Sequence, residues 1–332
     1  MADTLFPDTI VRTGEHLVTA LSHVTMPYGS LERQLLIAGT DAGHVVIWDL
    51  SIQSIVQNLN LHSNTVLFIH PLQYCNSIVA YTREQKVVFL LWCSDKRQLH
   101  IKKEIQPVES PCPTFCPAAS CRLSGTSAMS CLAIPCDKSV QLYSIEPSSA
   151  DIVAMDGMKL SAEAMVTCMK AFVRDDSSGV FLLVGTEAGN VNLFNYNAET
   201  KQTDSLSSLN THNEEPVLTL DFIVNSKFGV TAGASGRISV WKCDNSTLRS
   251  HLSIETPSKG YNSVRLRSDA KLIIACAWDG MVRLYGPKKG TCLAILDFHR
   301  ESVTAVSFDT DNRFVTSSKD KALCLWSLYA NK

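Results

Sequence analysis

Short apolar runs recur along the 332-residue chain, and several of them alternate with polar residues at a period of two. Val191–Phe194 and Ile238–Trp241 are examples, and both are rich in residue types that favour strands. Each run ends on an aromatic residue, and the seven aromatics, 41 to 51 residues apart, are Trp48, Trp92, Tyr143, Phe194, Trp241, Tyr285 and Trp326. A repeat of about this length is typical of four-stranded units arranged in a ring. The pattern predicts an all-β fold: a single domain over residues 1–332, folded as a seven-bladed β-propeller.

Turn signals precede several of these runs and support hairpins between their strands. Pairs ending in glycine occur at Ala42-Gly43, Ala188-Gly189, Ser235-Gly236 and Asp279-Gly280. Asp-Gly is favoured in type I′ turns, which need a positive φ at both central residues. We therefore expect a type I′ turn at Asp279-Gly280.

The last copy of the pattern contains a histidine, three hydroxyl residues, an aspartate and a tryptophan in a characteristic order. These are His299, the hydroxyl side chains of residues 316–318, Asp320 and Trp326. The order resembles that of WD repeats, in which such residues form one hydrogen-bonded chain. A buried indole N–H that lacks an acceptor costs about 1–3 kcal/mol. We expect His299, Thr316, Asp320 and Trp326 to form a structural tetrad in the seventh blade.

The other copies keep this tetrad only in part. Six residues before the closing aromatic, the third and sixth copies retain Asp137 and Asp279, whereas the first, fourth and fifth have Ala42, Ala188 and Ser235. Histidines at the start of a copy are His16, His62 and His212. We expect most blades to depend on apolar packing more than on the tetrad.

Ring closure needs a strand from the N-terminus. The chain ends soon after Trp326, which leaves the seventh blade without an outer strand. An open ring would expose two sheet edges, and exposed edges promote aggregation. Residues Thr9–Arg12 have strand character and are predicted to pair with the last blade.

Composition narrows the possible partners. The net charge of −2 and pI near 6.5 give no basic footprint for nucleic acid. Residues 1–20 lack the apolar core of a signal peptide, and no apolar run approaches the 18 or so residues of a membrane span. Twelve cysteines without a secretion signal indicate reduced thiols, so we expect the protein in cytoplasm and nucleus, without nucleic-acid or membrane binding.

One group of cysteines is a weak candidate for a metal site. Its members are Cys112, Cys116, Cys121, Cys131 and Cys136. None of their spacings is the two-residue step common in zinc sites. The favoured interpretation is loop and strand cysteines of the third blade, with no metal or other cofactor.

No combination of residues predicts catalysis. His212 with Glu214 and Glu215 could suggest a metal or acid–base site, but His212 occupies the histidine position at the start of a copy. Phosphate-binding loops, nucleophile elbows and deaminase motifs do not occur. We expect no enzyme.

Three stretches narrow the resemblance within the WD class: His212–Phe222, Ile274–Asp279 and Ser318–Tyr329. They resemble the guanine nucleotide-binding protein β-subunit-like protein 1 family, whose fungal member is the ASTRA-associated protein. The resemblance implies a non-catalytic scaffold linked to the TTT cochaperone complex, which matures phosphatidylinositol 3-kinase-related kinases. It also implies roles in DNA-damage signalling and chromatin.

Several alternatives stay open. A substrate receptor of a cullin-type ubiquitin ligase usually carries Trp-Asp-x-Arg, whereas Trp48–Ser51 lacks the arginine. Scaffolds in RNA or ribosome processing, or in intercellular transport, are further possibilities. A G-protein γ subunit is not expected as a partner, because only about eight residues precede the closing strand and γ pairing needs sustained heptads. By itself the chain is expected to be monomeric.

A partner-binding face is predicted where the turns before the closing runs meet the loops that start each blade. The residue before the turn aspartate should point onto this top face. In the sixth blade it is Trp278, and tryptophan is enriched at binding hot spots. Lys319, Asp41 and Glu187 hold the same place in the seventh, first and fourth blades. Packing over the neighbouring blade is the alternative role of Trp278.

Overall fold

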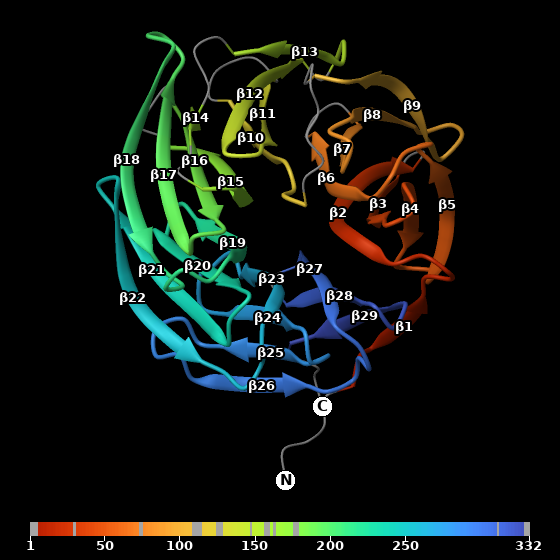
Figure 1. Ribbon diagram of the computed structural model, residues 1–332. Helices are drawn as coiled ribbons and strands as arrows, with labels where there is room; N and C mark the ends of the chain where they lie inside the picture. The colour runs from red at the N-terminus through yellow and green to blue at the C-terminus, as the bar shows by residue number, and fades with distance from the viewer. Residues whose placement is uncertain are drawn as a thin grey trace.

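The computed structural model shows a ring of seven antiparallel sheets around a central channel (Figure 1). The structure describes residues 6–28, 31–72, 76–107, 115–123, 129–146, 148–155, 160–161, 164–174, 179–310 and 312–328. Within these residues every regular element is a strand, as the sequence pattern predicts. No helix of the described residues has the length and apolar character needed to cross a membrane. The predicted seven-bladed β-propeller is confirmed.

The first four blades follow one another along the chain, each from its inner strand outward. Blade one contains β2 (Val18–Tyr28), β3 (Leu31–Thr40), β4 (His44–Asp49) and β5 (Ser54–Asn60). Blade two contains β6 (Val66–Leu72), β7 (Ser77–Thr82), β8 (Val87–Cys93) and β9 (Gln98–Ile105). Blade three contains β10 (Ala119–Arg122), β11 (Ser130–Cys136), β12 (Ser139–Glu146) and β13 (Asp151–Ala154), and β14 (Leu160–Ser161) also pairs with β12. Blade four contains β15 (Val166–Val173), β16 (Gly179–Thr186), β17 (Asn190–Asn197) and β18 (Gln202–Asn210).

The last three blades complete the ring. Blade five contains β19 (Val217–Ile223), β20 (Phe228–Gly233), β21 (Arg237–Asp244) and β22 (Thr247–Glu255). Blade six contains β23 (Tyr261–Leu266), β24 (Ile273–Ala277), β25 (Val282–Tyr285) and β26 (Cys292–Leu296). Blade seven contains β27 (Val303–Thr310), β28 (Arg313–Ser318) and β29 (Ala322–Ser327), with β1 (Thr9–Arg12) as its outer strand.

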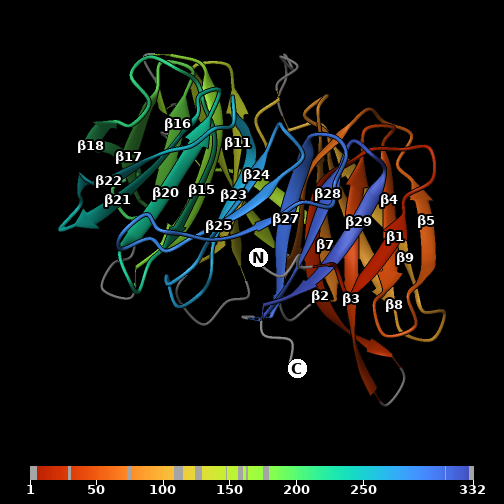
Figure 2. The same ribbon diagram turned by 90° about the horizontal axis from the view of Figure 1, so that it is seen from below.

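The N-terminal strand closes the ring, as predicted. β1 pairs antiparallel with β29, with Thr9 opposite Leu325 and Arg12 opposite Ala322 (Figure 2). Backbone N–H groups on either side extend the contact, because Asp8 donates to Leu325 and Thr13 donates to Lys321. The seventh blade therefore contains strands from both ends of the chain.

The apolar core lies between the blades. Seven apolar clusters occur among the described residues, one at each interface between neighbouring blades. The cluster between blades seven and one joins Trp48 of β4 to Val315 and Leu323, with Val11 of β1 packed against it. All seven closing aromatics are 6% exposed or less, so each lies in one of these interfaces. Packing between sheets is therefore continuous around the ring.

Inner strands also share a polar link to the next blade. In six of them a bulge leaves one extra residue, and in four of these six the extra residue has a side chain that can donate a hydrogen bond. Each donates to a backbone carbonyl of the next inner strand: Thr19 to Val66, Thr167 to Val217, Asn262 to Val303 and Thr304 to Val18. The last of these links blade seven to blade one. Bulges thus place a donor where two sheets approach each other near the channel.

The turn at Asp279-Gly280 differs from the expectation. Gly280 has a φ of 84°, but Asp279 is not among the residues with positive φ, so the turn is not type I′. In the same turn of blade one, the N–H of Gly43 donates to Thr40, and Gly43 has a φ of 77°. This geometry is a turn of type I followed by one left-handed residue, which also joins hairpin strands. A glycine after the turn was a correct signal for the hairpin but not for the turn type.

Candidate protein-interaction face

The four predicted tetrad residues of blade seven lie in one hydrogen-bonded chain. Nδ1 of His299 is 3.1 Å from Oδ2 of Asp320, and Nε2 of His299 is 2.9 Å from Oγ1 of Thr316. The indole Nε1 of Trp326 donates to the same hydroxyl at 2.9 Å. His299, Thr316 and Trp326 are each less than 5% exposed. The arrangement stabilises the blade and contains no reactive group open to a substrate.

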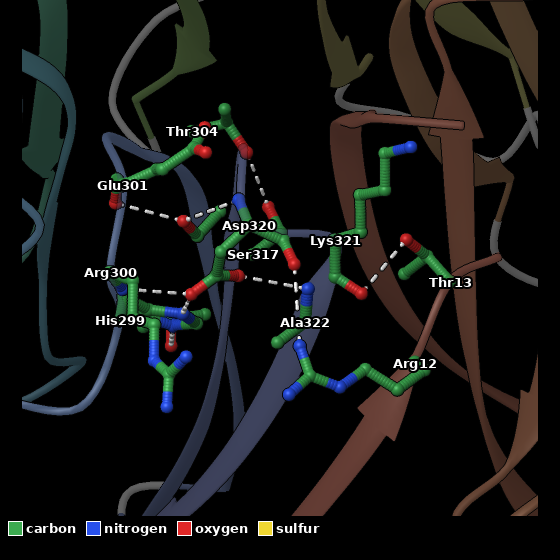
Figure 3. A network of polar contacts seen from close by, with 12 residues as sticks. Arg12, Thr13, His299, Arg300, Glu301, Thr304, Ser317, Asp320, Lys321 and Ala322 are labelled. Atoms are coloured by element: carbon green, nitrogen blue, oxygen red, sulfur yellow. Dashed lines mark hydrogen bonds and ion pairs between the residues drawn. The ribbon is translucent and has the colours of Figure 1, made fainter. Parts of the chain in front are cut away.

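Asp320 also ties this tetrad to the surrounding turn (Figure 3). Its carboxylate accepts the backbone N–H groups of Arg300 and Ala322, both at 2.9 Å. Burial by itself would raise the pKa of Asp320, but these hydrogen bonds and His299 hold it below its ordinary value. Burial lowers the pKa of His299, although the Asp320 carboxylate opposes that shift. Arg12 of β1 donates to the Asp320 carbonyl at 3.3 Å, so the closing strand reaches the same turn.

Blade five has three tetrad residue types but an interrupted chain. Nδ1 of His212 is 3.2 Å from Oγ of Ser235, the residue that replaces aspartate. Nε2 of His212 and Nε1 of Trp241 are buried without a hydrogen-bond partner in the described part of the chain. Thr231 lies ten residues before Trp241, but its hydroxyl donates to Ser239. Blade five is held by packing, as the sequence predicted for the partial copies.

The two retained turn aspartates do not act as tetrad members. Asp279 forms a bidentate ion pair with Arg283, with oxygen–nitrogen distances of 3.0 and 2.7 Å. Asp137 is exposed at the turn of blade three. His62, expected at the start of blade two as a tetrad histidine, is also exposed. An aspartate or a histidine at the tetrad spacing therefore does not form a tetrad when the hydroxyl residue that would link them is missing.

The predicted top-face residues occupy equivalent turns. The backbone N–H of each donates to the carbonyl of the residue that directly precedes the inner strand of the same blade. These pairs are Asp41 to Leu17, Glu187 to Met165, Trp278 to Gly260 and Lys319 to Ser302. Asp41 and Glu187 also accept the N–H of Leu17 and Met165 with their carboxylates. Asp41, Glu187 and Lys319 are exposed. The structure thus brings the four positions into equivalent places on one face of the ring.

Trp278 is both packed and exposed. Its indole lies against Gly260, where an added Cβ would come within 2.8 Å of three ring carbons. Nε1 of the ring donates to Oδ1 of Asn262 at 2.8 Å. The amide nitrogen of Asn262 in turn donates to Ser302 and Val303 of blade seven, both at 2.8 Å. The side chain nevertheless remains 39% exposed, so one fixed ring surface faces solvent.

Sequence reasoning missed the equivalent residue of blade two. The backbone N–H of Arg83 donates to Thr65, as in the other turns. Its guanidinium lies 4.0 Å from the centre of the Phe115 ring, which is 73% exposed. The left-handed residue after this turn is Gln85 rather than glycine, with a φ of 61°. Because no glycine marks this turn, Arg83 could not be identified from the sequence pattern.

The wall of the central channel contains an ion pair between Lys170 and Asp221. The channel has a volume of about 380 Å³ and is lined by residues of all seven blades. Nζ of Lys170 lies 3.0 Å from Oδ1 of the buried Asp221. Lys170 and Arg265, together with hydrogen bonds, hold the pKa of Asp221 below its ordinary value, although burial opposes this. The contact links β15 to β19 and stabilises the wall.

The cysteine group does not gather as a metal site in the described residues. Among these residues no cluster of three or more histidine, cysteine or acidic side chains could hold a metal ion. Cys112 lies outside the described residues. Cys121 and Cys131 are directly opposite each other on β10 and β11, and Cys116 is buried in the core between blades three and four. Their positions fit the interpretation as loop and strand residues.

Comparisons with known proteins identify the class. The family described as WD domain, G-beta repeat matches residues 203–242, 245–286 and 290–327, which extend from the outer strand of blade four through blade seven. Together with the ring of seven sheets, the match shows a seven-bladed β-propeller that contains WD40 repeats.

Individual relatives make the resemblance more specific. Guanine nucleotide-binding protein subunit beta-like protein 1 of Mus musculus is 27% identical over 326 residues, 97% of this chain and 96% of the mouse protein. ASTRA-associated protein 1 of Verticillium alfalfae is 26% identical over 336 residues, covering 93% of this chain and 80% of that protein. The Schizosaccharomyces pombe protein of the same name is 26% identical over 210 residues, covering 58% and 53%. The chain is homologous to these proteins at modest identity over most of its length, which confirms the resemblance found in the sequence.

Proposed function

We propose that this propeller is a non-catalytic adaptor of the cochaperone system that matures phosphatidylinositol 3-kinase-related kinases. Its homology to proteins named ASTRA-associated protein 1 and guanine nucleotide-binding protein subunit beta-like protein 1 supports a WD-repeat scaffold. The polar networks described above support the same view, because they are engaged in holding blades together. A role in kinase maturation would connect the chain to DNA-damage signalling and to chromatin.

Trp278 is the observation that carries the proposed binding face. Gly260 and Asn262 fix its ring in one orientation, so a partner that covers it loses little side-chain freedom on binding. Tryptophan is also enriched among residues that dominate binding energy. A ring that is 39% exposed and already immobilised is therefore suited to serve as an anchor.

Charged residues around the ring would orient the partner. Asp41 and Glu187 lie on blades one and four, whereas Arg83 and Lys319 lie on blades two and seven at equivalent turns. Complementary charges at the edge of an interface mainly set specificity and association rate. Substitutions of these four residues should therefore change the salt dependence of binding more than its strength.

Depletion and rescue in cells test the proposal. Loss of the protein should lower the abundance of the large kinases while their messenger RNA levels stay constant. Wild-type protein should restore abundance, and Trp278→Ala should fail to do so. Leu206→Ala is a matched control, because Leu206 is 37% exposed on the outer strand of blade four. Normal kinase abundance after depletion would overturn the proposal, and recovery of cullin adaptors or ribosomal factors in affinity purification would favour another scaffold role.

A further inference from the structure

The outer strand of blade six differs from the other six outer strands. These strands form the rim of the ring, and β26 lies on the rim away from the channel (Figure 1). β26 has the sequence CLAIL, and it is the one outer strand among the described residues without a polar or charged side chain apart from its cysteine. The outer strand of blade two, in contrast, contains two lysines and a glutamate. Proteins commonly place such charges on edge strands to prevent pairing with other chains.

The free edge of β26 has the features that strand pairing requires. β26 pairs with β25 on one side and is the last strand of its sheet. Leu293 is 58% exposed and Ile295 is 52% exposed, two positions apart on a short strand. On other outer strands, exposed large apolar residues are single, such as Val153 at 61% on β13. A segment paired with β26 would cover both side chains. It would also form hydrogen bonds with the backbone N–H and C=O groups on the free edge of the strand.

Charges at the two ends of β26 determine which end of an antiparallel segment should be acidic. Lys288 and Lys289 are exposed in the turn that precedes the strand, and Asp297 is exposed directly after it. The turn is compact, because the N–H of Gly290 donates to Gly286 at 2.8 Å. An antiparallel segment would end beside the lysines, so acidic residues at its C-terminal end would complement them. Acidic residues at the N-terminal end of the segment would instead be repelled by Asp297.

The size of the surface favours a peptide segment over a second copy of the chain. Stable dimers bury about 800 Å² on each partner. A five-residue edge with two exposed apolar side chains offers much less than this. Strand addition by an extended peptide works with an edge of this length, because backbone hydrogen bonds provide much of the affinity and alternate side chains provide specificity.

We propose that β26 binds an extended segment of a protein partner as a fifth, antiparallel strand of blade six. The segment has two aliphatic residues at alternate positions, followed by acidic residues at its C-terminal end. The site is on the rim and is separate from the proposed Trp278 face. A partner that uses both surfaces would contact the side and the top of the propeller.

Fluorescence anisotropy with the full chain tests this site. The probe is a labelled synthetic peptide in which three valines alternate with three threonines, followed by two glutamates. A control peptide of the same composition carries the two glutamates at its N-terminal end. We expect saturable binding of the first peptide with a Kd below about 1 mM, and binding of the control at least about fivefold weaker.

Variants of the chain locate the binding. Ile295→Lys should weaken binding by at least about tenfold, because a charge on the edge opposes strand pairing. Val153→Lys is the matched control on another outer strand and should leave binding unchanged. A variant with Lys288→Glu and Lys289→Glu, both in an exposed turn, should reverse the preference between the two peptides even if Ile295→Lys disturbs folding. Trp278→Ala should have no effect, which separates this site from the proposed function.

Three outcomes would overturn the proposal. The first is that neither peptide binds, and the second is that Ile295→Lys, with an unchanged melting temperature, binds as wild type does. The third is that sedimentation shows self-association of the chain that Ile295→Lys removes, because the occupant would then be a second copy.

Discussion

The indole ring of Trp278 lies directly against Gly260, at a distance that leaves no room for a side chain there. A Cβ on Gly260 would be 2.8 Å from three carbons of the ring. The carbonyl of Gly260 also accepts the backbone N–H of Trp278 at 3.0 Å. This hydrogen bond joins the start of blade six, before β23, to the turn after β24. The packing role and the binding role considered for Trp278 are therefore compatible. One ring surface is packed, and the opposite surface is available to a partner.

Asp320 should contribute much more to stability than an exposed acid. Asp320→Ala would leave the N–H groups of Arg300 and Ala322 and a ring nitrogen of His299 without their acceptor. Ala322 and His299 are buried, whereas Arg300 is exposed, so two of the three donors are stranded in the interior. Each stranded buried donor costs about 1–3 kcal/mol, so we expect a loss above about 2 kcal/mol in denaturant unfolding. Glu214→Ala, in an exposed loop, should stay within about 0.5 kcal/mol. Equal, small losses for the two variants would contradict a stabilising tetrad.

A pair of buried tryptophans that differ in hydrogen bonding, Trp326 and Trp241, provides a second test. Trp326 donates its indole N–H to Thr316, whereas the indole N–H of Trp241 is buried without a partner. Both rings stack on a phenylalanine, so replacement by phenylalanine removes similar apolar surface from each. Trp326→Phe should therefore cost about 1 kcal/mol more than Trp241→Phe, measured as free energy of unfolding. A larger loss for Trp241→Phe would show that blade five contains a network absent from this structure.

The repeat pattern was sufficient to predict the fold because each blade buries its closing aromatic in the same way. Spacing located all seven aromatics, and the missing outer strand of blade seven pointed to the closing strand at Thr9–Arg12. Spacing could not show which partial tetrads assemble, because that depends on side-chain partners far apart in sequence. Asp279 has the tetrad position, yet Arg283 four residues later binds it instead.

The residues at the equivalent turns of the candidate top face were predictable only in part, for a similar reason. Trp278, Lys319, Asp41 and Glu187 were found by counting back from each closing aromatic. Arg83 was missed because its turn lacks glycine, and the apolar edge of β26 was missed because exposure depends on where the sheet ends. Both features are set by neighbouring strands rather than by local sequence.

Closure by β1 predicts a large effect of an N-terminal deletion. Removing residues 1–13 would delete the pairing of Thr9–Arg12 with β29 and expose the core between blades seven and one. At about 1 kcal/mol for each lost hydrogen bond, the melting temperature should fall by at least about 5 °C. Arg12→Ala keeps the strand and should change melting by less than about 2 °C. A truncated chain that melts like wild type would rule out closure by β1.

Stability should decrease in mild acid because one buried and two half-buried histidines are held in neutral form. Burial lowers the pKa of His23, His70 and His212 from 6.5 to about 4. Between these values the unfolded chain binds more protons than the folded chain, so the free energy of unfolding falls as pH drops from 6.5 toward 4. One such group contributes up to about 1.4 kcal/mol per pH unit.

Substitution of one histidine tests this pH dependence. His212→Asn should give a shallower loss of stability than wild type between pH 6.5 and 4.5, measured by urea unfolding at several pH values. The two chains should have parallel profiles above pH 7, where the histidines are neutral in both states. The same slope for both chains in the acid range would show that His212 is not buried in neutral form.

Capture of the TTT cochaperone complex by the immobilised chain tests the central proposal most directly. Wild-type protein should retain the complex, and Trp278→Ala should bind it at least about tenfold more weakly, equivalent to about 1.4 kcal/mol, with little change in melting temperature. Gly260→Ala, which displaces the ring without removing it, should weaken capture as well, whereas Leu206→Ala should not. Capture by Trp278→Ala equal to that of wild type, or loss of capture only in step with unfolding, would contradict the account.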